Sequence, residues 1–96
     1  MYILITYDVN TEEKAGNRRL SRVARLCKDY GIRVQNSVFE CVLTEVQLTE
    51  LHNKLEGIID TQKDTIRIYF LNRNNCKRVI RMGRDSSVDF EGTLIL

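Results

Sequence analysis

The chain begins with a short apolar run that limits its possible folds more than any other feature. Residues 2–7 have the sequence YILITY, and an acid, Asp8, follows directly. Six residues rich in β-branched and aromatic side chains predict a strand that is buried on both faces at the centre of a sheet. The run has no basic leader and is too short to span a membrane, so we expect a cytoplasmic protein without membrane contact.

A helix is expected after this strand. Leu20, Val23 and Cys27 follow helical spacing and predict a helix over about residues 13–30. Gly31 would end it.

The second helix has the clearest beginning. Thr44 and Gln47 have the spacing of a capping box, and apolar residues at helical spacing continue to Ile58. The remaining strands are expected at residues 33–43, 64–71, 77–82 and 93–96, with a polar loop at 83–92.

These elements predict an α+β fold. We expect the ferredoxin-like β-α-β-β-α-β arrangement with one strand appended at the carboxyl end, in which two helices cover one face of an antiparallel sheet. A chain of 96 residues suffices for one core only, so residues 1–96 should form a single domain. The uncovered sheet face needs a partner, so we expect a homodimer packed through its sheets. The last strand could add to the neighbour's sheet or to another protein.

Composition excludes several classes of protein. Five glycines, no proline and no Gly-rich loop rule out phosphate-loop nucleotide enzymes. Cys27, Cys41 and Cys76 form no Cys-x-x-Cys pair, which disfavours a zinc site and a disulfide framework, so we expect reduced core thiols. His52 has no acidic or cysteine partner at a useful spacing and is expected to be structural.

Charge is unevenly distributed along the chain. The net charge is only +2, yet residues 66–84 carry six basic side chains and no acidic one. Residues 40–64, in contrast, carry six acids against two lysines. One part of the surface could therefore bind a polyanion, although a solvated charge pattern without a partner would give the same sequence.

Asp8 is the residue most suited to chemistry, because it ends an apolar central strand where we expect it to be buried. One carboxylate holds Mg²⁺ weakly, since such sites combine one or two carboxylates with waters and phosphate oxygens. A twofold axis would supply a second Asp8. The two carboxylates would repel each other, and a divalent cation would relieve that repulsion. The alternative is that Asp8 caps the following helix or turn.

Arginines mark the first helix. At about 100° per residue, Arg18, Arg22 and Arg25 fall within about 60° of one another, opposite the apolar stripe, and Arg19 lies to the side. Guanidinium groups suit phosphate oxygens, so this row could follow a nucleic-acid backbone without reading bases. A solvated helix face is the alternative for Arg22 and Arg25. A second basic group comprises Arg67, Arg73, Lys77, Arg78, Arg81 and Arg84.

Several of these residues match a known family. Tyr7-Asp8 at the end of the first strand, Arg18-Arg19, Gly31 and residues 35–40 (QNSVFE) resemble the CRISPR-associated protein 2 family over the whole chain. The resemblance implies a ferredoxin-like homodimer and a Mg²⁺-dependent endonuclease that acts on RNA or double-stranded DNA. By position, it implies Asp8 of each subunit as metal ligand with Tyr7 beside it, and Arg18 and Arg19 facing phosphate.

The resemblance also concerns contacts between chains. Ser37 and Phe39 would lie near the catalytic cleft or the dimer contact, although Phe39 could equally be plain core. Members of the family bridge two dimers of the CRISPR integrase through their carboxyl-terminal strand, which residues 93–96 match here.

Two functions of different classes follow. The first is a metal-dependent endonuclease of double-stranded DNA, single-stranded RNA or both, with Asp8 as catalytic residue and Mg²⁺ or Mn²⁺ as cofactor. Its nucleic-acid contacts would be Arg18, Arg19, Arg22 and Arg78. The second is a non-catalytic DNA-binding scaffold that bridges CRISPR integrase dimers during spacer acquisition, for which Asp8 is not needed. A small-molecule sensing domain is a third possibility, which the arginine distribution disfavours.

Overall fold

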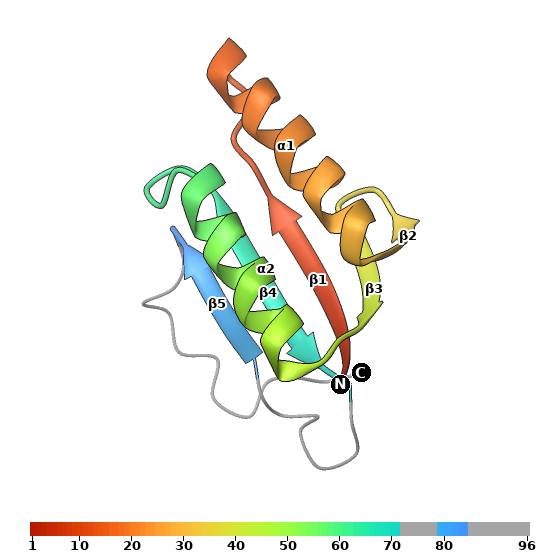
Figure 1. The fold of residues 1–96 in the computed structure, drawn as a ribbon. Helices are drawn as coiled ribbons and strands as arrows, with labels where there is room; N and C mark the ends of the chain where they lie inside the picture. Colours follow the sequence, from red (N-terminus) through yellow and green to blue (C-terminus); the bar gives the residue numbers. More distant parts are fainter. Residues whose placement is uncertain (72–78, 85–96) are drawn as a thin grey trace.

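The structure, a computed structural model, describes residues 1–71 and 79–84. Two helices cover one face of a single antiparallel sheet (Figure 1). In chain order the elements are β1 (Tyr2–Asp8), α1 (Lys14–Tyr30), β2 (Gly31–Gln35), β3 (Val38–Val42), α2 (Glu45–Ile58), β4 (Thr65–Phe70) and β5 (Val79–Gly83). The sheet order is β2-β3-β1-β4-β5, and every neighbouring pair is antiparallel. The predicted α+β class is confirmed.

Some predicted elements fall outside the described residues. The strand expected at 77–82 is found as β5, Val79–Gly83, and residues 77 and 78 lie outside the described residues. Of the loop expected at 83–92, residues 85–92 lie outside the described part of the chain, as does the strand expected at 93–96.

The prediction of one long strand over residues 33–43 is wrong. The segment folds back on itself, because β2 and β3 pair in antiparallel fashion with an irregular register between Arg33 and Gln35. The turn between them includes Ser37, whose φ of 63° lies in the left-handed region that few non-glycine residues adopt. The segment from residue 32 to residue 43 contains no glycine or proline to mark the turn, so apolar periodicity alone suggested a continuous strand.

Gly31 ends α1 as predicted, for a steric reason. Its backbone is extended, and it is also the first residue of β2. A Cβ at this position would lie 2.3 Å from the carbonyl oxygen of Glu40 and 2.4 Å from Sγ of Cys41. Only glycine therefore allows β2 to lie this close to β3 at the helix end.

The capping box of α2 is confirmed. The Thr44 Oγ1 atom accepts a hydrogen bond from the Gln47 amide at 3.1 Å, and the Thr44 amide donates to Gln47 Oε1 at 2.9 Å. Neither helix in the described ranges is long and apolar enough to cross a membrane.

The core lies between the sheet and the helices. β1 is the central strand, between β3 and β4, as predicted. The prediction that both its faces are buried is wrong for the single chain, because both helices lie on one side. Fully buried side chains of the core include Ile3 and Ile5 from β1, Ile66, Ile68 and Phe70 from β4, Val23 and Cys27 from α1, and Leu51 and Leu55 from α2. Each such side chain contributes about 1.5–3 kcal/mol by leaving water.

The other face of the sheet has no helix over it. Tyr2, Leu4, Thr6 and Asp8 alternate with the buried residues of β1 and project from this uncovered face. Towards the β2 edge, the apolar side chains of Ile32, Val34 and Val42 are exposed.

The predictions for Cys27 and Cys41 are confirmed, and one for His52 is wrong. Cys27 and Cys41 are free and buried, and burial raises the pKa of their thiols to about 12 and about 11. Cys76 lies outside the described residues. His52 does have an acidic partner, since its Nδ1 lies 3.1 Å from Glu56 Oε1, one helical turn further along α2.

Candidate nucleic-acid interface and acidic strand end

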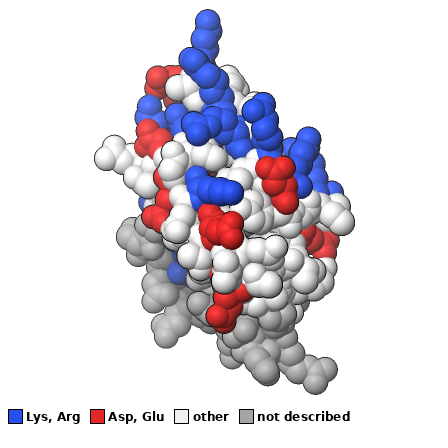
Figure 2. Space-filling view, in the orientation of Figure 1, with Lys and Arg blue, Asp and Glu red and all other residues white. Residues whose placement is uncertain are grey.

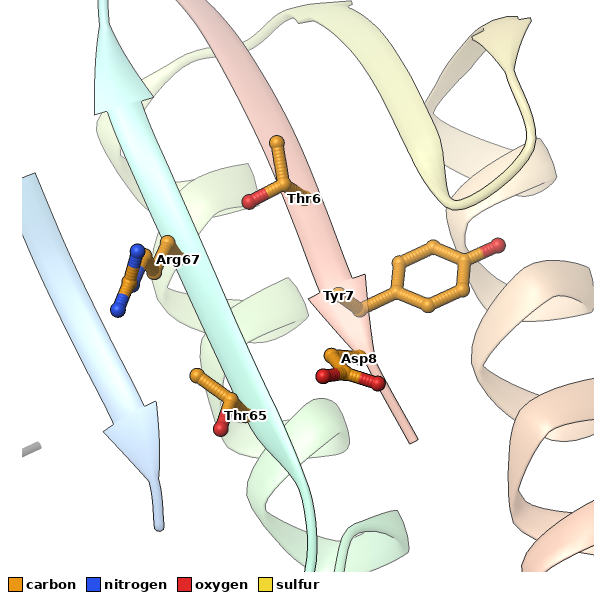
Figure 3. Close-up of a pocket in the computed structure, with 5 residues that line it drawn as sticks. All are labelled: Thr6, Tyr7, Asp8, Thr65 and Arg67. Carbon is orange, nitrogen blue, oxygen red and sulfur yellow. The ribbon is translucent and has the colours of Figure 1, made fainter. Parts of the chain in front are cut away.

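Asp8 ends β1 on the uncovered face of the sheet. It lies opposite Thr65 of β4 in the strand register, and Thr6 lies opposite Arg67. These four residues and Tyr7 line a small cavity of about 140 Å³ (Figure 3). The Asp8 side chain is 78% exposed in the single chain, so the expectation of burial is wrong. The reason is that no helix packs on this face.

Asp8 caps neither the helix nor the turn that follows it. The residue before the first turn of α1 is Glu13, which makes no side-chain capping bond. Asn10 supports the turn instead, because its Oδ1 accepts a hydrogen bond from the Glu12 amide at 2.9 Å. The Asp8 carboxylate contacts Arg84, whose Nη2 lies 3.5 Å from Asp8 Oδ2. This carboxylate is thus available to an external ligand.

The sequence reasoning missed Asp64, a fully buried carboxylate directly before β4. Arg19 donates to it twice, from Nε to Oδ2 at 2.7 Å and from Nη2 to Oδ1 at 3.2 Å. Burial alone would raise the pKa of Asp64. Hydrogen bonds from Arg19 and from the amides of Asp60 and Asn10 outweigh burial and lower this pKa below its ordinary value. An acid at the start of an otherwise apolar strand was the signal that could have indicated a buried partner.

The structure separates the four arginines of α1. Arg19 forms an ion pair with Asp64, and its predicted contact with phosphate stays a prediction. Arg18, Arg22 and Arg25 are exposed, and Figure 2 shows basic side chains gathered over α1. Since α1 lies on the covered face of the sheet, this row does not lie beside Asp8. Two basic side chains of the described residues lie beside Asp8: Arg67 lines the same cavity and Arg84 contacts the carboxylate. Arg78 lies outside the described residues.

Tyr7 and Phe39 project to the covered side of the sheet. Tyr7 points away from Asp8 towards α1 (Figure 3) and stacks on Phe39, with ring centroids 6.2 Å apart. Phe39 is fully buried in the single chain, as its alternative as plain core predicted. Burial raises the pKa of Tyr7, against the effect of the neighbouring Arg33 guanidinium. Tyr7, Arg33 and Ser37 line a second cavity, of about 400 Å³, between α1 and the β2–β3 turn.

The ligand set around Asp8 fits part of a magnesium site. No three His, Cys, Asp or Glu side chains come together in the described part of the chain. Asp8 offers one exposed carboxylate, with Thr6 and Thr65 lining the same cavity. Mg²⁺ takes oxygen ligands and is commonly held by one or two carboxylates with waters and phosphate oxygens. One chain therefore supplies one carboxylate of such a site, and a second chain would supply the other.

Fold and site together define a small α+β protein with an exposed carboxylate at the end of its central strand and three exposed arginines on its first helix. Comparison with known proteins assigns it further. The model of the family described as CRISPR associated protein Cas2 matches residues 1–79. The chain belongs to this family, as its sequence motifs indicated.

Individual relatives cover the whole chain. It is 48% identical over 95 residues to the CRISPR-associated endonuclease Cas2 of Halalkalibacterium halodurans, covering 99% of each chain. It is also 48% identical over 96 residues to the CRISPR-associated endoribonuclease Cas2 1 of Moorella thermoacetica, covering 100% of each. The crystal structure of Streptococcus pyogenes Cas2 at pH 6.5 superposes with a TM-score of 0.71 at 54% identity, covering 77% of this chain and 89% of that one.

Proposed function

We propose that this protein is a CRISPR adaptation protein that acts as a metal-dependent endonuclease on phosphodiester bonds of double-stranded DNA, single-stranded RNA or both. The observation that carries the proposal is the exposed Asp8 carboxylate on the uncovered sheet face, with Arg67 and Arg84 beside it. A carboxylate next to basic side chains can bind a cation and a phosphate in one place. The names of the relatives, an endonuclease and an endoribonuclease, support the same activity.

The proposal includes a ferredoxin-like homodimer packed through its sheets. The strand order and the coverage of one face by both helices support this arrangement. The exposed Val42 and Tyr2 on the open face are apolar surface that a second copy would cover. Packing about a twofold axis through this face would bring two Asp8 carboxylates towards each other.

In this dimer, Asp8 of each subunit would hold Mg²⁺, for which Mn²⁺ could substitute. When bound, the cation would polarise a phosphate and lower the pKa of a water for attack on phosphorus. Arg67 and Arg84 would stabilise the negative charge that develops on the phosphate oxygens. Arg18, Arg22 and Arg78 would hold the backbone of the substrate further away, without base recognition. Ser37, in the turn between β2 and β3, would border the catalytic cleft on the side of β1 opposite to β4.

The test compares wild type with Asp8→Asn, which keeps the side-chain size and removes the charge. Purified proteins are incubated with labelled duplex DNA or single-stranded RNA, with Mg²⁺ and with EDTA, from pH 6 to 9. We expect wild type to cleave in Mg²⁺ and not in EDTA, and we expect no cleavage by Asp8→Asn in either. Light scattering should show the same dimer for both proteins. Equal cleavage by both proteins would contradict the assignment of Asp8 and point to a contaminating nuclease.

A second function is favoured by a separate observation. Arg18, Arg22 and Arg25 are exposed on α1, which covers one face of the sheet, whereas Asp8 projects from the other face (Figure 1), so these arginines could hold a duplex that never reaches the carboxylate. This arrangement suits a non-catalytic DNA-binding scaffold that bridges CRISPR integrase dimers. Its test is salt-dependent duplex binding that survives Asp8→Asn, with loss of integrase assembly when residues 93–96 are removed.

A further inference from the structure

The buried Asp64 carboxylate joins two segments that are distant from it in sequence, at Asn10 and Arg19, to the loop that precedes it. Its Oδ1 accepts from the Asn10 amide at 3.0 Å, and its Oδ2 accepts from the Asp60 amide at 2.9 Å. Arg19 of α1 donates to both oxygens. Every partner is a hydrogen-bond donor. Only an ionised carboxylate can accept from such donors at both of its oxygens, because a protonated carboxyl carries a donor of its own.

The first of these segments leads directly out of Asp8. Asn10 is two residues beyond Asp8, and its amide is held by Asp64 while its carbonyl oxygen accepts from Arg19 Nη2 at 3.4 Å. Gly16 allows α1 to approach the same carbonyl, because a Cβ there would lie 1.8 Å from the Asn10 oxygen. The chain that leaves β1 is therefore held at Asn10 through both its amide and its carbonyl group.

The main chain of Asp64 fixes the arginine that reaches Asp8. Its carbonyl oxygen accepts from the Arg84 amide at 2.7 Å. Gly83, at a φ of +98°, makes this approach possible, since a Cβ there would lie 2.1 Å from the same oxygen. Arg84 Nη1 also donates to the Lys63 carbonyl at 3.3 Å, which directs its other nitrogen, Nη2, towards Asp8.

We propose that Asp64 is a positioning residue for Asp8, since it fixes the chain on the carboxyl side of Asp8 through its side chain and Arg84 through its carbonyl. The inference rests on the proposed function, because it matters for catalysis only if Asp8 is the catalytic carboxylate. It gives Asp64 no contact with the substrate. Within the described part of the chain, the Asp8 carboxylate itself makes one long side-chain contact, to Arg84.

The test uses Asp64→Asn and a matched control, Leu51→Ala, which removes buried apolar volume from α2 on the core side of the sheet. The asparagine keeps the size of the side chain but places N–H groups against the donors of Arg19 or Asp60. In cleavage assays at a temperature where both variants are folded, we expect Asp64→Asn to lower kcat about 10- to 100-fold with little change in KM. Leu51→Ala should keep the wild-type kcat. An equal kcat for the two variants would overturn the proposal and leave Asp64 a purely structural residue.

Amide hydrogen exchange separates this proposal from the proposed function. In Asp64→Asn, the Asn10 amide should exchange at least about tenfold faster than in Leu51→Ala, measured by NMR at matched global stability. If Asp8→Asn cleaves as well as wild type, the proposed function fails. Fast exchange of the Asn10 amide in Asp64→Asn would, even then, support the role of Asp64 in positioning the segment that follows Asp8. Unchanged exchange at Asn10 would overturn that positioning. If Asp64→Asn does not fold, Arg19→Lys replaces it. This milder variant keeps the cation but loses the bidentate contact with Asp64, and it is tested by the same measurements of kcat and of Asn10 amide exchange.

Discussion

Two aspartates near the same end of the sheet have opposite surroundings. The Asp8 side chain is 78% exposed and, among residues 1–71 and 79–84, makes one polar contact, at 3.5 Å, whereas Asp64 is fully buried and its carboxylate accepts four hydrogen bonds between 2.7 and 3.2 Å. The first lies on the sheet face that no helix covers, and the second lies where α1 packs against the loops. A carboxylate whose hydrogen bonds are all made within the fold stabilises that fold. A carboxylate left open to solvent can bind a ligand.

The arginines of α1 repeat this contrast. Arg19, which is partly buried, forms the ion pair with the fully buried Asp64, while Arg18 and Arg22, one residue before it and three after it, are exposed. Residues one apart in a helix point about 100° away from each other, so neighbouring arginines can serve different purposes. The predictions below test whether structure and function are divided between these residues in this way.

The largest expected effect is on catalysis at the exposed aspartate. Asp8→Asn should lower cleavage about 1,000-fold, because the ligand of the cation is lost. The free energy of unfolding of this exposed site should change by less than about 0.5 kcal/mol. Cleavage rates and urea unfolding of the same preparation check both values. A large loss of stability would remove the contrast with Asp64.

Next is the stability effect at the buried aspartate. Asp64→Asn should lower the free energy of unfolding by about 3 kcal/mol, since it leaves Arg19 partly buried without its charge partner. Urea unfolding followed by circular dichroism measures the change. Exchanging Lys63 of the exposed Lys63–Glu13 pair for Gln is the matched control and should change the free energy of unfolding far less, because water screens this pair. Equal costs for the two variants would show that burial of the pair does not matter.

Acid unfolding should separate the same residues by pH. The pKa of Asp64 in the folded state lies below its ordinary value of 3.8. Its ionised form therefore stabilises the fold fully at pH above that value, and the contribution is lost as the pH falls through the folded-state pKa. Wild type should lose stability more steeply than Asp64→Asn below about pH 4. Parallel curves for the two proteins in that range would contradict the role given to the Arg19 contact.

The smallest expected effect concerns the exposed arginines. Arg22→Gln should weaken duplex binding and reduce the dependence of log affinity on log salt by about one unit, because one phosphate contact is lost. Stability should be unchanged. Duplex affinity is measured by fluorescence anisotropy between about 50 mM and about 200 mM salt, a range in which phosphate contacts change affinity clearly. An unchanged slope of log affinity against log salt would assign Arg22 to a solvated helix face.

Local sequence patterns determined a large part of this protein. The apolar run before Asp8 indicated the central strand, and the spacing of Thr44 and Gln47 indicated the start of α2, because a capping box involves residues three apart in sequence. The motif around Tyr7-Asp8 and residues 35–40 indicated the family. The turn at Ser37 was not found, since its left-handed backbone follows from pairing of β2 with β3 and not from a glycine.

The tertiary structure alone decided which charged residues became structural. Arg19 and Asp64 are 45 residues apart in sequence, and no periodicity relates a helix position to the start of a strand that far away. The exposure of Asp8 likewise depends on which face of the sheet the two helices cover, and an apolar strand sequence does not specify that face. Short-range patterns are set by the geometry of one helix or strand, whereas the environment of a charge is set by whatever packs against it from elsewhere in the chain.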